Sequence, residues 1–299
     1  MKPIEKKTRQ IFHKIHAEQA KDGPTFKRLV DLLSPKYLKV PDDFFFGKTC
    51  LDAGCGSNAN ATYSMLNAGA AKVYAFDLDK SIFKTVLKML KGFEKRYELA
   101  VGNVLKIDFP DNFFDFTHCS GVLHHTTDTF KGIRELARVT KKDGMLYIYI
   151  HGQGGLMREV INFIRGKYVK DKNYRRLIDN IDEIFFWELW DWMVSEMAKH
   201  GDKLGEAVPK DLIEQLFNKD FALSVKDRFT APISHDFTEK ELRKLLKSLG
   251  FTRIERLTRY PNNKNIRRFL SPFYNQYDHK FSRIFYGEGN MQLKAVKKS

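Results

Sequence analysis

The stretch Lys48-Thr-Cys-Leu-Asp-Ala-Gly-Cys-Gly-Ser-Asn58 decides the fold of this chain. The apolar run Thr49–Leu51 predicts a short strand, and the residues from Asp52 to Gly56 predict the turn that leaves it. Gly54 and Gly56 permit backbone angles and a close ligand approach that a Cβ atom would block. Residues 59–68 are expected to form a helix that ends at Gly69. The free amides at the N-terminus of that helix would then face a ligand.

Further segments of the same kind follow in order along the chain. They are Val73-Tyr-Ala-Phe-Asp-Leu-Asp79, Val101-Gly-Asn-Val104 and Phe114-Asp-Phe-Thr-His-Cys-Ser-Gly-Val-Leu-His-His125. A second strand, 71–76, stops at Asp77, where a carboxylate can accept hydrogen bonds from both hydroxyls of a ribose. Because ligands bind outside the carboxyl ends of parallel strands, this order indicates a nucleoside-binding α/β sheet.

The turn itself distinguishes between two classes of nucleoside-binding fold. Dinucleotide binders favour G-x-G-x-x-G, whereas here Asp52 precedes Gly54, Gly56 and Asn58. This order resembles motif I of the class I S-adenosylmethionine-dependent methyltransferases. The resemblance covers roughly residues 47–151. Within the class, this segment is similar to the ubiquinone/menaquinone-biosynthesis-like subgroup of small-molecule methyltransferases. It continues through Gly102-Asn-Val104, Pro110-Asp-Asn-Phe-Phe-Asp115, Ser120-Gly-Val-Leu-His-His125 and Glu135-Leu-Ala-Arg-Val-Thr-Lys-Lys-Asp-Gly144.

Two positions depart from the pattern of that family. Asn58 stands where many members have a third glycine, and asparagine tolerates the left-handed region better than most residues. Lys142-Asp143 replaces Pro-Gly at a position expected to be a surface turn. Neither departure weakens the expectation that S-adenosylmethionine is the cofactor.

The resemblance implies a contact for each part of that cofactor. Acidic and glycine residues of the first turn would surround its methionine end, and Asp77 would bind the ribose. A carbonyl at the end of the fourth strand would accept from the methionine ammonium, and residues after the second and third strands would meet the adenine face and edge. The cofactor-binding set is Asp52, Gly54, Gly56, Asp77, Leu78, Asn103, Val104 and Ser120. The alternatives are a simple turn residue for Asp77 and a loop cap for Asn103.

Methyl transfer is a direct displacement, so holding the acceptor in line supplies much of the rate. An oxygen acceptor usually also needs a base, and histidine is suited to that role near neutral pH. The candidates are His124 and His125 after the fourth strand, His151 at the end of the fifth, and His235 beside Asp236. A structural role in their loops is the alternative. The three cysteines contain no C-x-x-C pair, so no metal site is expected.

The pattern predicts an α/β fold with a Rossmann-like, seven-stranded, mostly parallel sheet and helices on both faces. Residues 1–46 are expected to form an N-terminal helical cover, with helices at 7–20 and 24–33. Residues 47–150 and 236–299 would form the cofactor-binding core, and 151–235 a helical lid over the acceptor. The remaining expected elements are strands at 145–150, 251–259 and 290–296, and helices at 156–164, 174–200, 209–217 and 238–249. The last helix has a Thr238/Glu241 capping box and a C-terminal Gly250.

Composition limits the possible classes of protein. Of the 299 residues, 42% are hydrophobic, which supports a folded core, and no apolar run is long enough to span a membrane. The charged start lacks the apolar segment of a secretory signal, so a cytoplasmic protein is expected. The net charge of +15 would fit nucleic acid or an anionic substrate. A genome with A+T-rich codons explains this net charge better, because the lysines are scattered along the chain and lysine outnumbers arginine.

Two segments could shape the acceptor site. The tryptophan-rich segment, Phe185–Trp192, could line a pocket for an apolar or cationic acceptor, or could only pack the lid. The segment Arg259–Arg268, with Lys280 and Arg283, could bind a phosphate, or could be a solvated loop.

The leading hypothesis is a methyltransferase acting on a small molecule, anionic or aromatic, with O-methylation favoured over N or C. An RNA methyltransferase is the alternative, although no nucleic-acid module or acceptor motif accompanies the core. A non-catalytic S-adenosylmethionine-binding protein is the second alternative. The oligomeric state is left open.

Overall fold

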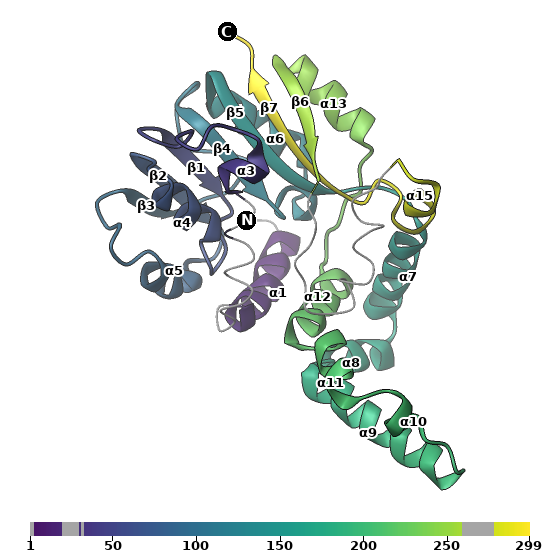
Figure 1. Ribbon diagram of the computed structural model, residues 1–299. Helices are drawn as coiled ribbons and strands as arrows, with labels where there is room; N and C mark the ends of the chain where they lie inside the picture. The colour runs from purple at the N-terminus through teal and green to yellow at the C-terminus, as the bar shows by residue number, and fades with distance from the viewer. Residues whose placement is uncertain (1–2, 20–29, 31–32, 259–277) are drawn as a thin grey trace.

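The computed structural model describes residues 3–19, 30, 33–258 and 278–299. Within these residues, seven strands form one sheet in the order β3-β2-β1-β4-β5-β7-β6 (Figure 1). Neighbours from β3 to β5 pair in parallel, and β7 runs antiparallel to both β5 and β6. The predicted fold class is therefore confirmed. The strands are β1 Thr49–Ala53, β2 Lys72–Asp77, β3 Tyr97–Val101, β4 Phe114–Ser120, β5 Thr140–His151, β6 Phe251–Leu257 and β7 Asn290–Lys297.

Helices cover both faces of the sheet, because successive strand residues point to opposite sides. Leu51 and Leu146 face one core, which α6 (Thr129–Val139) and α13 (Glu239–Ser248) close. Their neighbours Cys50 and Tyr147 face the other core. That second core is closed by α3 (Pro35–Leu38), α4 (Asn60–Asn67) and α5 (Phe83–Met89). Two short 3-10 helices, η2 (Lys80–Ile82) and η3 (Leu123–His125), follow β2 and β4.

The local signals for two helix ends are confirmed. Thr238 Oγ1 accepts a hydrogen bond from Glu241 N at 3.2 Å, and Glu241 Oε2 accepts one from Thr238 N at 2.9 Å. Gly250, directly after α13, and Gly69, after α4, have φ angles of 83° and 92°. Glycine adopts this region at little cost, so each residue lets the chain turn back into a strand.

The N-terminal cover and the fifth strand differ from the prediction in extent. Helix α1 spans Pro3–Gln19, and most of the second expected helix, 24–33, lies outside the described residues. Strand β5 begins at Thr140, immediately after α6, and includes Lys142-Asp143. The surface turn expected there is instead an irregularity within the strand, with a φ of 59° at Asp143 and a register shift against β4.

A helical insertion stands between β5 and α13. Its helices are α7 Leu156–Lys170, α8 Lys172–Asn180, α9 Glu183–Lys199, α10 Leu204–Ala207, α11 Lys210–Leu216 and α12 Lys219–Thr230. The expected single helix 174–200 is wrong, because the chain is extended at Ile181 and Asp182, which separate α8 from α9. Asp182 Oδ1 accepts from Phe185 N at 2.8 Å and so begins a new helix. Helix α12 was not predicted at all.

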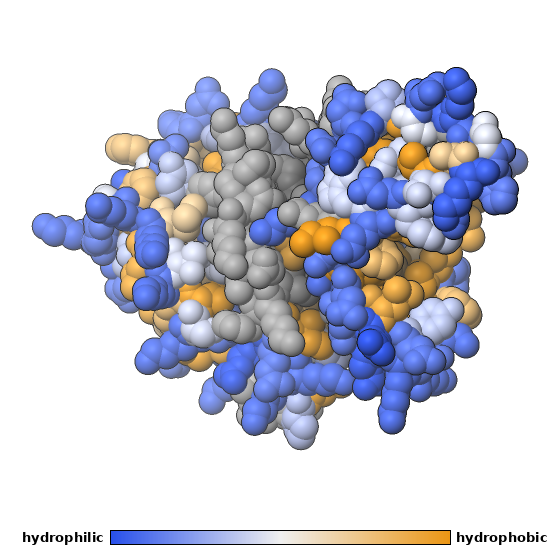
Figure 2. Space-filling view, turned by 90° about the horizontal axis from the view of Figure 1, so that it is seen from below, coloured by the Kyte–Doolittle hydropathy of each residue, from blue (hydrophilic) through white to orange (hydrophobic). Residues whose placement is uncertain are grey.

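The insertion has two parts with different positions. Helix α12 lies between α1 and α7, below the sheet, whereas α9 and α10 point away from it (Figure 1). Large apolar side chains are exposed on these helices, among them Phe163, Ile184 and Trp192. Figure 2 shows apolar surface on its right half, where the insertion lies. Among the residues described, no helix combines the length and the apolar character needed to cross a bilayer.

Both ends of the insertion are joined to the core at one place. Gln153 N donates to Phe237 O at 2.8 Å, and Phe237 N donates to His151 O at 3.2 Å. The chain then passes the turn between α15 (Lys280–Tyr286) and β7 so closely that only glycine fits. A Cβ atom on Gly155 would lie 2.3 Å from Gly287 N.

Candidate active site

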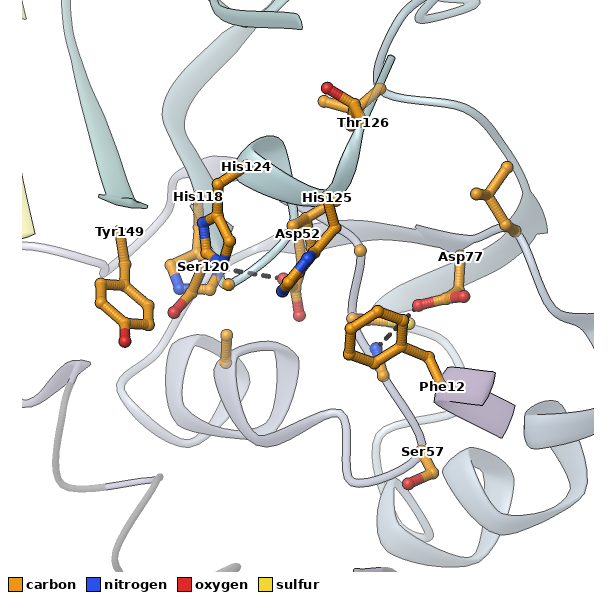
Figure 3. Close-up of a pocket in the computed structure, with 18 of the residues that line it drawn as sticks. Phe12, Asp52, Ser57, Asp77, His118, Ser120, His124, His125, Thr126 and Tyr149 are labelled. Carbon is orange, nitrogen blue, oxygen red and sulfur yellow. Dashed lines mark hydrogen bonds and ion pairs between the residues drawn. The ribbon is translucent and has the colours of Figure 1, made fainter. Parts of the chain in front are cut away.

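A cavity of about 370 Å³ opens at the carboxyl ends of β1, β2, β4 and β5. Its volume lies in the range typical of small-molecule sites. Loops after these strands form its floor, and α1 and α12 contribute the opposite wall. Figure 3 shows how Asp77, Asp52 and the histidines converge on it from separate strands.

The glycine turn after β1 has the predicted backbone conformation. Gly54 and Gly56 have φ angles of 83° and 62°, and Gly54 N donates to Phe76 O at 2.8 Å. A Cβ atom on Gly54 would lie 2.4 Å from Val122 Cγ2, so a glycine is required where this turn meets the loop after β4. After this turn, the residue with a positive φ angle is Ala59, at 42°, and not Asn58, which replaces the third glycine of the family pattern.

Asp52 is almost fully buried, with 1% of its surface exposed, and both of its oxygens have protein partners. Oδ2 accepts from Thr62 N at 3.0 Å and Thr62 Oγ1 at 2.7 Å. Oδ1 lies 2.9 Å from His118 Nδ1 (Figure 3). Asp52 therefore accepts a hydrogen bond from a backbone amide near the N-terminus of α4, where Ala59 provides no side-chain cap. It lines the cavity, but its first role is to join α4 to β4.

Asp77 is more open than Asp52 and is held by backbone amides. Its Oδ2 accepts from Gly56 N and its Oδ1 from Asp79 N, both at 3.1 Å. These amides orient the carboxylate at the wall of the cavity that it lines. This geometry suits the expected contact with a pair of ribose hydroxyls.

The residues expected around adenine are close together in the cavity wall. Leu78 lines it after β2, and Val104 lines it after β3. Asn103 Oδ1 accepts from Leu105 N at 2.9 Å, so its carbonyl caps its own loop and a ligand contact would fall to its side-chain amide. Ser120 is the last residue of β4 and lines the cavity between the histidines and Asp52.

Three of the four predicted histidines are brought together and buried. His124 and His151 are stacked, with ring centroids 3.8 Å apart, and His125 lies 4.2 Å from His124. All three line the cavity. Among the described residues, Nδ1 of His124 and Nδ1 of His151 are buried without a hydrogen-bond partner. The described part of the chain contains no His, Cys, Asp or Glu group arranged to bind a metal ion.

Burial keeps these histidines neutral. It lowers the pKa of His124 and of His151 well below the usual range, and nearby positive charges from Arg158 and Arg165 lower both further. The pKa of His125 is also lowered by burial, against the opposing charge of Asp227. His125 Nδ1 lies 2.7 Å from Ile233 O, and a carbonyl only accepts. Neutral His125 therefore carries its proton on Nδ1 and has a basic Nε2.

His235 is not brought to the cavity. Its side chain is exposed, and it is absent from the cavity lining. Its backbone N donates to His124 O at 2.9 Å, which holds the loop after β4. Its neighbour Asp236 pairs with Arg158, with Oδ1 3.4 Å from Nε.

Several lining residues lie outside the predicted set. Phe12 of α1 packs on His125 with ring centroids 4.7 Å apart, and Asp227 and Arg228 come from α12. His118 lies within β4 and stacks on Tyr147 at 5.2 Å. One signal for α12 was present in the sequence, because Asn218 Oδ1 accepts from Phe221 N at 3.3 Å as an N-cap.

Of the two alternatives for the tryptophan-rich segment, the structure supports packing within the insertion. No residue of 185–192 lines the cavity, so the alternative that this segment forms an acceptor pocket is wrong. Phe186 packs on Phe217 and Phe221 at 5.3 and 5.5 Å, while Trp192 is 61% exposed. The segment 259–268 lies outside the described residues. Arg283 pairs with Glu288 at 3.2 Å.

Comparison with known proteins agrees with this geometry. Residues 51–148 match the family model described as a methyltransferase domain. The ubiquinone/menaquinone biosynthesis C-methyltransferase of Escherichia coli is 33% identical over 105 residues, covering 34% of this chain and 42% of that protein. The demethylmenaquinone methyltransferase of Geobacillus stearothermophilus is 31% identical over 102 residues, covering 33% and 43%. An uncharacterized protein of Methanocaldococcus jannaschii is 32% identical over 111 residues, covering 37% and 44%.

The matched segment thus spans less than half the length of each of these relatives. Among solved structures, magnesium protoporphyrin IX methyltransferase from Synechocystis, with bound SAH, is 15% identical with a TM-score of 0.48. That comparison covers 100% of this chain and 89% of the other. A 1,6-didemethyltoxoflavin-N1-methyltransferase from Burkholderia thailandensis is 14% identical with a TM-score of 0.45, covering 90% and 77%.

The matched segment and the ordered sheet identify residues 51–148 as a methyltransferase domain of the class I, S-adenosylmethionine-dependent kind. In sequence this domain is similar to that of the ubiquinone/menaquinone C-methyltransferases. S-adenosylmethionine is the cofactor of the class, and Asp77, the glycine turn and the cavity beside them fit a nucleoside with a charged side chain.

Proposed function

We propose that the protein transfers a methyl group from S-adenosylmethionine to a small-molecule acceptor, with an oxygen atom favoured over nitrogen or carbon. One observation carries the proposal. The same cavity contains the oriented carboxylate of Asp77 and two buried imidazoles, His124 and His151, that have Nδ1 atoms without a partner among the described residues. A nucleoside site and unprotonated bases thus share one enclosed space.

The cofactor residues act by binding and orientation. Bound S-adenosylmethionine would supply a methyl group activated by the sulfonium charge. Asp77 would hold the ribose, Leu78 and Val104 would enclose the adenine, and the Ser120 carbonyl would accept from the methionine ammonium. Gly54 and Gly56 let the turn follow the ligand closely. Asp52 would act on the methionine end mainly through its charge, since its oxygens already accept from Thr62 and His118.

The histidines provide the base that an oxygen acceptor needs. His151 ends the fifth strand, and His124 lies in η3 after the fourth strand. Burial lowers the pKa of both, so both are unprotonated at neutral pH. His125 offers a basic Nε2 because its Nδ1 donates to Ile233 O. We favour His124 or His151, since both line the cavity and burial keeps both imidazoles neutral.

The wall formed by α1 and α12 would limit the access of water during transfer. Phe12 covers His125 from α1, and α12 presents Ser224, Asp227 and Arg228 to the cavity. Exclusion of water strengthens electrostatic interactions in a site and protects a reactive methyl group.

The first test follows a labelled methyl group. The protein is incubated with methyl-labelled S-adenosylmethionine and, in separate samples, a small-molecule extract or total RNA. Label in the small-molecule fraction supports the proposal, whereas ribonuclease-sensitive label would favour RNA as the acceptor. Cofactor binding without transfer to either fraction would indicate a non-catalytic binding protein.

The second test addresses the base, once an acceptor is known. His124→Ala or His151→Ala should lower turnover by roughly 10²–10⁴-fold, the usual range for loss of a general base, with unchanged cofactor affinity. Wild-type kcat should also persist below pH 6.5, because the base stays unprotonated there. Full activity in single variants of all four candidates, His124, His125, His151 and His235, would show that positioning alone suffices.

A further inference from the structure

Arginine side chains from two helices lie beside the buried histidines. We call Arg158 and Arg165 of α7 and Arg228 of α12 the arginine cluster. Arg165 Nη2 donates to the backbone O of Arg228 at 2.6 Å, which joins the two helices. Arg158 is 9% exposed, and Arg228 lines the cavity with its Nη1 donating to Ser224 Oγ at 2.9 Å. Arg9 of α1 lines the same cavity.

Positive charge exceeds negative charge on this side of the cavity. In the described part of the chain, the carboxylates that face the cluster are Asp236, paired with Arg158, and Asp227. Burial and then the charge of Arg158 lower the pKa of Arg165, so two guanidinium groups repel each other in a partly buried space. The neighbouring histidines are neutral and do not offset or add to this charge.

The arginine cluster acts on more than one of the buried histidines. Burial lowers the pKa of His151, and the charges of Arg158, Arg228 and Arg165 lower it further. Arg165 and Arg158 also lower the pKa of His125, against the charge of Asp227. Of the cluster, Arg228 lines the cavity and is the guanidinium group that a ligand there would meet.

One donor of the arginine cluster lacks a hydrogen bond. Arg165 Nε is buried without a partner among the described residues. Leaving a buried donor unsatisfied costs free energy, and an oxyanion would satisfy donors and charge together. Arginine is well suited to this, because its planar fork matches carboxylate and phosphate groups.

We propose that the acceptor carries an oxyanion, a carboxylate or a phosphate, which Arg228 binds at the wall of the cavity, with Arg165 behind it adding positive charge. The inference rests on the proposed function, since it assigns the chemical class of that acceptor. Asp227, which also lines the cavity, would then accept from a hydroxyl or amine of the same molecule. An acceptor bound in this way would present its reacting group near His124 and His125.

Binding of small probes tests the proposal without an identified acceptor. The protein is first saturated with S-adenosylhomocysteine, and benzoate, phenyl phosphate and the neutral isostere benzamide are titrated by calorimetry at constant ionic strength. Benzoate or phenyl phosphate should bind at least tenfold more tightly than benzamide. The stronger of the two identifies the oxyanion. Equal binding of all three probes would overturn the proposal with no variant required.

Variants then locate the binding site. Arg228→Gln should weaken the preferred anion by about tenfold or more, the loss expected for one charge-assisted hydrogen bond, and Arg228→Lys should restore part of it. Arg176→Gln is the matched control, because Arg176 is exposed on α8 and does not line the cavity. Unchanged anion affinity in Arg228→Gln, or an equal loss in Arg176→Gln, would contradict the assignment.

A third readout separates a binding role from a structural one. The bound anion should raise the pKa of His151, followed by its ring proton resonances, because it offsets the guanidinium charges that lower it. No shift on saturation would contradict the placement. The proposed function is judged separately: if S-adenosylhomocysteine does not bind, that function fails, whereas its binding without anion selectivity refutes only the present inference.

Discussion

Asp52 and Asp77 show how similar carboxylates at one sheet edge acquire different duties. Asp52 is enclosed and its oxygens accept from α4 and from His118. Asp77 is half-buried and accepts from backbone amides of two turns. Replacing Asp52 should therefore affect folding first, whereas replacing Asp77 should affect binding of the cofactor first.

The first prediction concerns Asp77. Asp77→Ala removes an acceptor for ribose hydroxyls and should weaken S-adenosylmethionine binding by about 2–3 kcal/mol, the cost typical of hydrogen bonds to a charged group. Calorimetry measures this, with Asp108→Ala as the control because Asp108 is exposed and does not line the cavity. Wild-type affinity in Asp77→Ala would rule out the ribose contact.

The second prediction separates the two reasons for a glycine at position 54. Gly54→Ala should lower the free energy of unfolding by about 2–4 kcal/mol, combining overpacking with a left-handed residue. Gly250→Ala is the matched control, because Gly250 has the same φ of 83° and a Cβ atom added there would meet nothing within 4 Å. The Gly250→Ala variant should lower the free energy of unfolding by about 1 kcal/mol.

Urea unfolding of a double variant completes that comparison. Adding Val122→Ala to Gly54→Ala removes the methyl group that the new Cβ would meet at 2.4 Å, and should recover most of the difference between the two single glycine variants. If Gly54→Ala unfolds like Gly250→Ala, the contact with Val122 does not determine the glycine.

At the scale of elements, the sequence predicted the strands well and the insertion less well. Strands β1, β2 and β4 are short apolar runs that end at turn residues, so neighbouring residues in the sequence indicate where each strand begins and ends. Asp182 and Asn218 are N-caps that mark the starts of α9 and α12, but a single cap residue does not show that a new helix follows, which also depends on packing against other helices. Asp227 and Arg228 could not be placed in the site for the same reason, since their helix was not predicted.

The third prediction follows from the two parts of the insertion. S-adenosylhomocysteine should slow amide hydrogen exchange in α12 and α1, because both contribute to the cavity wall. Exchange in α9 should be unchanged, because α9 contributes no lining residue. Mass spectrometry of peptides from the free and bound protein measures this. Equal protection of α9 and α12 would instead mean that the whole insertion orders as one lid.

For the whole molecule, the buried histidines connect folding with pH. Burial lowers the pKa of His124, His125 and His151 in the folded chain, whereas in the unfolded chain each returns to about 6.5. Below that pH the histidines bind protons in the unfolded state but not in the folded state. The contribution of these residues to stability is therefore complete above pH 7 and is lost as the pH falls below 6.5.

The fourth prediction puts a magnitude on this effect. Between pH 7.5 and 5.5, a histidine that stays neutral when folded should lower the free energy of unfolding by about 1.4 kcal/mol. His151→Asn should reduce the loss measured for the wild type by that amount. His200→Asn should not, because His200 is exposed at the end of α9. The same pH dependence in wild type and His151→Asn would show that His151 is protonated in the fold.

The seven-stranded, mostly parallel sheet and the position of Asp77 at a strand end were predicted from the sequence, because each strand is followed by its own turn signal. The convergence of His124 and His151 also followed, because parallel strands end at one edge. Their stacking, the exposure of His235 and the pairing of His118 with Asp52 did not. These depend on side-chain packing between segments distant in the chain.

The joined ends of the insertion have a consequence for how this chain can change over evolution. Residues 152–153 and 237 are hydrogen-bonded neighbours, so everything between them is topologically a single large loop on an intact sheet. Such a loop can be shortened, lengthened or exchanged without altering the path of any strand. The side chains expected to meet the acceptor and those expected to hold the cofactor are thus free to diverge separately, and a new substrate range can arise by replacing one contiguous piece of the gene.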